Sequence, residues 1–351
     1  MYTFEPLDSQ CEDTWDEVLK QCPGSNAFHS TAWRAALDQA FVQLSPMYYL
    51  IKENSTLIGG FPAFVFKPIP GVKMLHSMPW NLFGGIQLIA GAEVDIKALI
   101  ESTDKELADV VHGQKICEAF FTLSPVQTVE YGHRLSEIGY QKHKTLFTHV
   151  LKTSEDYEVL WKAYNKRVRG AVRKAAKAGV SVSDANTDAE LEAFYRLYLA
   201  TVKRLGGTPK PRSLIQFLYR SRIGKLAIAK RDGAVIAGLL YLHFNRTVTL
   251  WCEASDPKSL EHRPNNAIFH HIIHWACERG YEYVDFGASP PEHHGLIAHK
   301  EQYKAQRFEF CSYIKIHSRW RRRVWRSAEP SLRKLYTCIQ HARSIGQPKQ
   351  A

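Results

Sequence analysis

The fold of this chain is decided by Leu226-Ala-Ile-Ala-Lys-Arg-Asp-Gly-Ala-Val-Ile-Ala-Gly-Leu-Leu-Tyr-Leu-His-Phe244. Two apolar runs rich in branched residues surround Asp232-Gly233, the strongest short-range signal for a β-hairpin. A third run, Thr247 to Ala254, follows at hairpin distance. The period then changes: apolar residues from Ile268 to Cys277 recur at helical spacing, and Tyr281 to Phe286 reads as a strand. The sequence therefore predicts three antiparallel strands, a loop, a helix and a further strand.

The same hairpin occurs earlier in the chain. Ile51-Lys-Glu-Asn-Ser-Thr-Leu-Ile-Gly-Gly60 aligns without a gap on Ala229-Lys-Arg-Asp-Gly-Ala-Val-Ile-Ala-Gly238, 178 residues later. This distance indicates domain duplication, because solenoid units repeat at roughly 20 to 50 residues. A turn pattern common to many hairpins is the alternative explanation.

At 351 residues the chain exceeds the size at which single cores stop growing, so two domains are expected. We predict an α/β chain with mixed sheets, with domains at 1–151 and 152–316 and a basic helical tail at 317–351. No apolar run approaches a membrane span, and the acidic start lacks the features of a signal peptide. Seven cysteines without CxxC spacing fit reduced thiols. These features favour a cytoplasmic protein without a transmembrane segment.

Basic charge gathers in two segments. From Cys311 to the end the chain has ten Lys or Arg residues and a single acid, Glu329. The helix expected from Asp156 to Gly179 has no acid after Glu158, and its basic stripe consists of Lys162, Lys166, Arg169, Arg173 and Lys177. A solvated helix face is the usual explanation of a charge run, and the absence of compensating acids favours an anion-binding face equally.

A loop in the first domain carries Trp80, Asn81 and the pair Gly84-Gly85. Glycines let the backbone approach a ligand closely, and an aromatic side chain beside them can stack on a sugar or base. An ordinary tight turn explains the same residues. We keep Trp80 and Asn81 as candidate substrate-binding residues beside that alternative.

Three segments carry a family resemblance. Arg167-Val-Arg-Gly-Ala-Val-Arg-Lys-Ala-Ala-Lys-Ala-Gly-Val180 resembles the Arg-x-x-Ile-x-Lys-Ala-x-Lys-x-Gly-Val segment of FemAB-like proteins, which are tandem GNAT-fold acyltransferases. Phe194 to Pro209 is similar to the helix and turn before the family's second hairpin. Asp285-Phe-Gly287, His299-Lys300 and Tyr303-Lys-Ala305 resemble its Asp-Phe-Gly and Phe-Lys-x-x-(Trp/Phe)-Gly patterns. The resemblance implies two tandem GNAT-like domains followed by the basic helical segment.

Two departures from the family pattern bear on the binding residues. His299 stands where the family usually has an aromatic residue before its lysine, and Ala305 where it has glycine. The Gly-rich pyrophosphate signature of CoA-binding GNAT enzymes is also missing, and Arg263, Asn265 and Asn266 stand at that helix start. Free backbone N–H groups and the helix dipole can still hold a phosphate there, with Arg263 adding charge.

Other chemistries find little support in the sequence. Asp285-Phe-Gly287 also spells the magnesium motif of protein kinases, but neither a His-Arg-Asp loop nor a Gly-x-Gly-x-x-Gly loop accompanies it. His270 and His274 lie one helical turn apart without acidic ligands at metal spacing, so we expect no metal site.

The resemblance implies an acyltransferase. It would move an acyl or aminoacyl group from acyl-CoA or aminoacyl-tRNA to an amine or hydroxyl of a cell-envelope precursor or saccharide. Such enzymes mainly position the reactants and stabilise a tetrahedral intermediate. We expect Lys300 to stabilise the oxyanion or hold a donor phosphate, Asp285 to order the site, and Glu253 or a loop histidine to accept the proton. Arg169 and Arg173 are candidate phosphate ligands, and His299 would line the donor site.

The rival hypothesis is a non-catalytic GNAT-fold module that binds tRNA or anionic lipid through its basic segments. The tail Arg319-Trp-Arg-Arg-Arg-Val-Trp-Arg326 interleaves tryptophan with arginine, and Leu332 to Ile345 predicts a helix after Pro330. This composition suits peripheral contact with the anionic cytoplasmic face of the inner membrane. Contact with nucleic acid, or packing of the two tryptophans on the first domain, explains the same residues.

Overall fold

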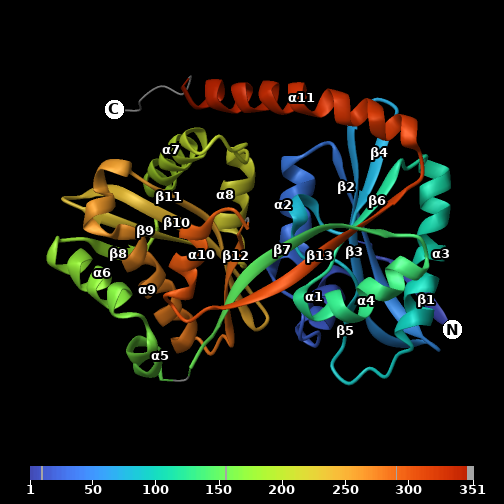
Figure 1. Cartoon of the computed structure of the whole chain (residues 1–351), viewed down its shortest axis with the longest axis horizontal. Coiled ribbons are helices and arrows are strands. Elements are labelled where there is room, and N and C mark those ends of the chain that lie inside the picture. Colours follow the sequence, from blue (N-terminus) through green and yellow to red (C-terminus); the bar gives the residue numbers. More distant parts are fainter. Residues whose placement is uncertain (9–10, 155, 290, 346–351) are drawn as a thin grey trace. The chain divides into compact units, whose positions relative to one another are not determined.

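The computed structural model describes residues 1–8, 11–154, 156–289 and 291–345, with side chains up to residue 340. The chain forms two compact units (Figure 1). Unit 1 comprises Met1–Thr148, Ala288–Glu292 and Arg307–Ser327. Unit 2 comprises His149–Gly287, His293–Gln306 and Ala328–Ala351.

Unit 1 is built on a mixed sheet with the strand order β1-β2-β3-β4-β6-β13-β7, and β5 pairs with β3. Strands β4 and β6 are parallel, whereas β13 is antiparallel to β6. Strand β7 continues from unit 1 into unit 2. The elements are β1 (Tyr2–Pro6), α1 (Glu12–Lys20), η1 (Ala27–His29), α2 (Thr31–Ala40), β2 (Leu44–Glu53), β3 (Thr56–Ile69), β4 (Val72–His76), η2 (Pro79–Asn81), β5 (Gln87–Leu88), α3 (Ile96–Gln114), β6 (Glu118–Thr122), α4 (Pro125–Glu137), β7 (Gln141–Lys152) and β13 (Gln306–Ile316).

Unit 2 contains the sheet order β12-β11-β10-β9-β8, in which only β11 and β12 are parallel among the pairs described. Helices α7 and α8 pack on one face of this sheet, and α9 covers the other face (Figure 1). The elements are α5 (Tyr157–Ala163), α6 (Lys166–Lys177), β8 (Ser181–Asp184), α7 (Asp188–Arg204), α8 (Arg212–Arg220), β9 (Gly224–Arg231), β10 (Ala234–Phe244), β11 (Thr247–Ser255), η3 (Pro257–His262), α9 (Pro264–Glu278), β12 (Tyr283–Ser289) and α10 (His294–Glu301).

The two predicted hairpins are present, and they share a turn geometry. Asp232 and Gly233 have φ angles of 51° and 77°, and Asn54 and Ser55 have φ angles of 47° and 70°. Two consecutive positive φ angles characterise the tight turns whose twist matches that of a hairpin. The Asp-Gly signal therefore identified the turn at Asp232-Gly233 correctly, and the alignment of the two segments identified the turn at Asn54-Ser55.

The pairing register of the two hairpins is also the same. In each ladder one isoleucine of the second strand is skipped, Ile236 in β10 and Ile58 in β3, so both strands carry a bulge at the same place. The flanking pairs are Lys230 with Val235 and Ala229 with Ala237 in unit 2, and Lys52 with Leu57 and Ile51 with Gly59 in unit 1. A common turn does not account for a common bulge, so the register supports duplication over the alternative of two similar turns.

Two matched glycines, one in each unit, pack in the same way. A Cβ atom on Gly60 would lie 2.6 Å from the Trp15 ring of α1, and one on Gly238 would lie 2.6 Å from the Phe194 ring of α7. Both distances are far below van der Waals contact. In each unit, an aromatic side chain from a helix, α1 or α7, therefore packs directly on the backbone of the second hairpin strand, β3 or β10.

The prediction of a single helix from Asp156 to Gly179 is wrong, because the structure has two helices there, α5 and α6. The break falls at Tyr164 and Asn165, which have ψ angles of 150° and 142°. Asn165 caps α6 through its side chain, and its backbone N–H donates to the carbonyl of Gln302 at 3.0 Å. Tyr164 is buried in the core of unit 2. Capping and tertiary packing therefore outweigh the continuous helical pattern of the sequence.

The tail forms one helix, α11 (Arg319–Ile345), which begins earlier than the expected helix and contains Pro330. Its first part, to Ser327, belongs to unit 1, and the remainder belongs to unit 2. Trp325 packs against Phe66, with ring centroids 5.8 Å apart, whereas Trp320 is exposed. Packing therefore explains one of the two tail tryptophans and leaves the other at the surface.

Candidate functional site

Lys300 lies on α10 with its side chain buried. Its Nζ atom donates a hydrogen bond to the backbone carbonyl of Gly287 at 2.6 Å. Burial lowers the pKa of Lys300 to about 8, and the charges of Asp285 and Glu253 oppose this shift. The three residues predicted from the sequence as catalytic therefore lie close enough to interact electrostatically.

Glu253 reaches this cluster from β11. The residue is accessible to solvent, but protein surrounds its carboxyl group closely enough that desolvation raises its pKa to about 7. The Lys300 ammonium group opposes the rise. A carboxylate with a pKa near neutrality is suited to act as a general base at physiological pH.

Asp285 and Gly287 shape the end of β12. The buried carboxylate of Asp285 accepts a hydrogen bond from the Gly287 backbone N–H at 2.8 Å. Gly287 has a φ angle of 73°, which a residue with a side chain adopts only with strain. Parallel pairing sets Thr249 of β11 opposite Asp285, and the buried Thr249 hydroxyl has no hydrogen-bond partner among the described residues. The strand end therefore offers Lys300 a carbonyl and a carboxylate.

Aromatic side chains pack beside Lys300. Tyr303 is fully buried, with ring centroids 5.5 Å from Phe269 and 5.7 Å from Phe286. His299 packs 5.4 Å from both Phe269 and Tyr303, and burial lowers the pKa of its imidazole. Asn266 donates to the Tyr303 hydroxyl at 2.9 Å. His299 therefore contributes a neutral ring to an aromatic lining, where the family pattern has an aromatic residue.

The start of α9 is open to an anion. Arg263 precedes the helix with a φ angle of 60° and is exposed, Pro264 is the first helical residue, and no side-chain hydrogen bond caps this end. The first backbone N–H groups of the helix are therefore available to a ligand. The buried Oδ1 atom of Asn265 also lacks a hydrogen-bond partner within the described part of the chain.

Arg169 and Arg173 lie on α6, and both contact α5. The Arg169 guanidinium donates to the carbonyl groups of Trp161, at 3.4 Å, and Lys162, which are at the end of α5. The Arg173 guanidinium lies 5.8 Å from the centre of the Trp161 ring and is exposed. Arg169 therefore holds the junction of the two helices, while Arg173 faces solvent.

Trp80 and Asn81 belong to unit 1, whereas the residues described above belong to unit 2. Their φ angles are 59° and 57°, in the left-handed region that costs roughly 1 to 3 kcal/mol for a residue with a side chain. The Trp80 ring packs 5.4 Å from Phe41 and 6.2 Å from Trp33, yet the residue is 43% exposed. Strained backbone of this kind concentrates at ligand-binding positions, which supports the candidacy of both residues.

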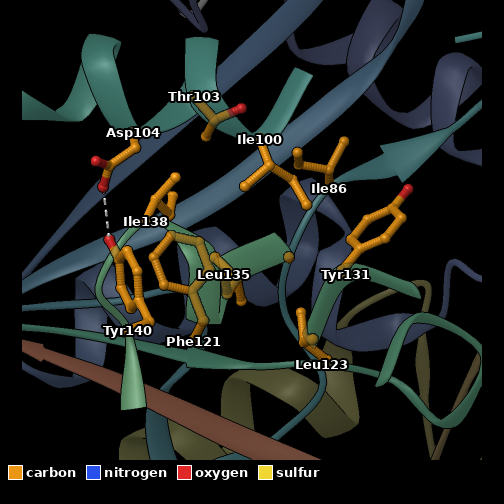
Figure 2. Close-up of a pocket in the computed structure, with 11 residues that line it drawn as sticks. Ile86, Ile100, Thr103, Asp104, Phe121, Leu123, Tyr131, Leu135, Ile138 and Tyr140 are labelled. Carbon is orange, nitrogen blue, oxygen red and sulfur yellow. Dashed lines mark hydrogen bonds between the residues drawn. The ribbon is translucent and has the colours of Figure 1, made fainter. Parts of the chain in front are cut away.

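The first repeat has apolar residues at the positions of the charged cluster. The matched registers place Phe120 at the position of Asp285 and Ile86 at that of Glu253. Leu135 corresponds to Lys300, because each lies six residues before the next strand along the chain, which is β7 after Leu135 and β13 after Lys300. Figure 2 shows Ile86 and Leu135 lining a small pocket of about 20 Å³, a volume with room for about one water molecule. The charged cluster is therefore a feature of unit 2.

Comparison with known proteins agrees with this fold. Residues 162–305 match the acetyltransferase (GNAT) domain family. The structure superposes on the crystal structure of FemX with a TM-score of 0.74 and 14% identity, over 93% of this chain and 100% of that one. The chain therefore has the fold of FemX, and residues 162–305 form a GNAT-type domain. A tandem GNAT protein from the clavulanic acid biosynthesis pathway gives a TM-score of 0.58 at 11% identity, over 90% of this chain and 98% of that one.

A curated relative in sequence is the UDP-N-acetylmuramoylpentapeptide-lysine N(6)-alanyltransferase of Weissella viridescens. The chain is 22% identical to it over 135 residues, which is 37% of this chain and 39% of the relative. The match thus spans well under half of the relative's length. Within the described part of the chain, no helix is both long and apolar enough to cross a bilayer.

Sequence reasoning missed several residues of the candidate site. Gly287 supplies the acceptor for Lys300, and its need for a positive φ angle was implicit in the Asp-Phe-Gly motif. Tyr303 lies just beyond the end of α10, and its place in the Tyr303-Lys-Ala305 segment that resembles the family pattern could have marked it. Phe269 and Thr249 carried no signal, since an apolar helix position and a strand threonine are ordinary features of a core.

Proposed function

We propose that this protein is an acyltransferase whose active site lies in unit 2. The observation that supports the proposal best is the cluster of buried Lys300 with Asp285 and Glu253, in which desolvation by the surrounding protein moves the pKa values of the lysine and the glutamate toward neutrality. Shifts of this kind are typical of catalytic groups. The apolar residues at the matched positions of unit 1 argue that the cluster is not a requirement of the fold.

In the proposed reaction an acceptor amine attacks the carbonyl carbon of the donor. Glu253 takes the proton of the attacking nitrogen as the C–N bond forms, and Lys300 stabilises the negative charge on the carbonyl oxygen. Collapse of the intermediate breaks the bond to the leaving group, which receives the proton that Glu253 took from the amine. Asp285 positions the strand end through its bond to the Gly287 N–H, which directs the Gly287 carbonyl at Lys300.

The donor that we propose is aminoacyl-tRNA, with acyl-CoA as the alternative. The support is α6, on which Lys166, Arg167, Lys174 and Lys177 are exposed and form no ion pair among the described residues. A row of unpaired basic groups suits a phosphate polymer better than the few phosphates of CoA. The open start of α9 would hold a phosphate of either donor.

The acceptor that we propose is an anionic cell-envelope precursor with a free amine, in line with the substrate named for the Weissella relative. Trp80 and Asn81 are the candidates to contact its sugar. Both donors are cytoplasmic compounds, so the proposal places the reaction in the cytoplasm.

The test is a transfer assay with the full chain. Radiolabelled alanyl-tRNA is incubated with UDP-N-acetylmuramoyl pentapeptide, and thiol release from acetyl-CoA is measured in parallel with the same acceptor and with amino sugars. Label transfer to the acceptor is the expected result. Thiol release without label transfer would show an acyltransferase with the other donor, and tRNA binding without turnover would favour the non-catalytic module.

A further inference from the structure

Helix α11 has one face that packs on the protein. Trp325 lies against Phe66, Arg322 pairs with Glu118 at 2.7 Å, and the Arg321 guanidinium donates to the Lys115 carbonyl at 3.0 Å. These contacts orient the helix about its own axis, at least over the part that belongs to unit 1. The surface of the helix beside these contacts is therefore left facing solvent.

That outward face carries a row of large apolar side chains. Trp320 is 64% exposed, Val324 46%, Leu335 57% and Ile339 40%. Residues four apart lie one above the other on a helix, so Trp320 and Val324 form one step of the row and Leu335 and Ile339 form another. Exposed apolar side chains arranged in a row on one helix face indicate a binding surface, whereas single exposed ones do not.

A row of basic residues runs beside the apolar one. Arg319, Arg323, Arg326 and Lys334 are exposed and form no ion pair among the described residues. Glu329 is the only acid on the whole helix. The outward face of α11 is thus amphipathic, with apolar and cationic rows side by side.

We propose that this outward face of α11 binds the surface of an anionic lipid bilayer. The apolar row would enter the headgroup region, where tryptophan is favoured, and the basic row would lie against lipid phosphates. Aliphatic side chains such as Val324 and Leu335 provide no plane on which a base can stack, which favours lipid over RNA. The inference is independent of the proposed catalytic function.

The test is co-sedimentation of the full chain with vesicles of neutral phosphatidylcholine or of phosphatidylcholine with phosphatidylglycerol. We expect binding to the anionic vesicles at low ionic strength and much less at high ionic strength, because salt screens exposed charges. Arg319→Gln, Arg323→Gln and Arg326→Gln together should weaken partitioning by roughly fivefold for each charge removed. Val324→Ser with Leu335→Ser should also weaken it.

A matched variant controls for net charge. Lys105→Gln, Lys203→Gln and Lys258→Gln remove three exposed charges elsewhere and should leave sedimentation close to that of the unchanged protein. Melting temperatures verify folding, since all the altered side chains are exposed. The proposal is overturned if the full chain stays in the supernatant, if the control weakens binding as much as the α11 variant, or if α11 is needed for tRNA binding and not for vesicle binding.

Discussion

Leu135 in the first repeat occupies the position that Lys300 holds in the second. Both side chains are buried, both precede the last strand of their repeat by six residues, and the residue two before that strand has a positive φ angle in each case, 93° for Gly139 and 65° for Lys304. One fold position therefore accepts either an apolar group or a cation. Because burying a lysine is costly, its presence in unit 2 points to a use beyond stability.

Replacing Lys300 with methionine tests this use. We expect turnover in the transfer assay to fall by roughly a hundredfold, the scale of losing one group that stabilises an oxyanion. The melting temperature should stay close to that of the unchanged protein, because methionine fills a similar volume without an unpaired charge. Leu135→Met at the matched position is the control and should retain full turnover. Equal turnover in the two variants would show that Lys300 has no role in catalysis.

The pH dependence of kcat/KM should be bell-shaped with a narrow maximum. Glu253 must be ionised to accept a proton, which requires a pH above its pKa of about 7. Lys300 must be protonated to stabilise the oxyanion, which requires a pH below its pKa of about 8. The maximum is therefore expected between these two values, and the two limbs report the pair rather than either group alone.

Variants of the pair assign the two limbs. Glu253→Gln should abolish the rise on the acid side, and it should move the fall on the alkaline side to lower pH, because the Glu253 charge raises the pKa of Lys300. Lys300→Met should move the acid-side rise to higher pH, because the lysine charge lowers the pKa of Glu253. The measurement is the residual kcat/KM of each variant over the range from about pH 5 to about pH 10, which shows whether each limb of the profile moves as predicted. An unshifted profile would show that the two groups do not act together.

Arg169 and Arg173 of α6 should have different roles. Arg173→Gln should weaken tRNA binding and reduce the slope of log affinity against log salt by roughly 0.7 to 0.9, the value for one phosphate contact. Arg169→Gln should mainly lower stability, by about 1 kcal/mol, because its guanidinium bonds carbonyl groups at the end of α5. Filter binding over a salt series and thermal melting measure the two effects. A salt slope that stays unchanged in Arg173→Gln would make the stripe an ordinary solvated face.

Local sequence signals predicted the hairpins well and the tertiary features poorly. Asp232-Gly233 dictated its turn because few residues adopt consecutive positive φ angles. The break at Asn165 was missed because it depends on the buried Tyr164 and on a bond to the carbonyl of Gln302, far along the chain. Asp285 and Glu253 could be chosen as candidate catalytic residues beside Lys300 only through the family resemblance. Their convergence arises from strand register and helix packing, which a single sequence does not encode locally.

The last prediction concerns the packing that the two repeats share. Gly238→Ala would place a Cβ atom 2.6 Å from the Phe194 ring, so we expect it to destabilise the protein by roughly 1 to 3 kcal/mol through overpacking. Gly170→Ala on α6 is the matched control, since no atom lies within 4 Å of its added Cβ and alanine favours the helix by about 1 kcal/mol. Urea unfolding should therefore shift the midpoint down for Gly238→Ala and up for Gly170→Ala. Gly60→Ala should behave like Gly238→Ala, because its Cβ would meet Trp15 at the same distance. If Gly238→Ala and Gly60→Ala are both tolerated, the close helix-to-strand contact does not limit the packing of either repeat.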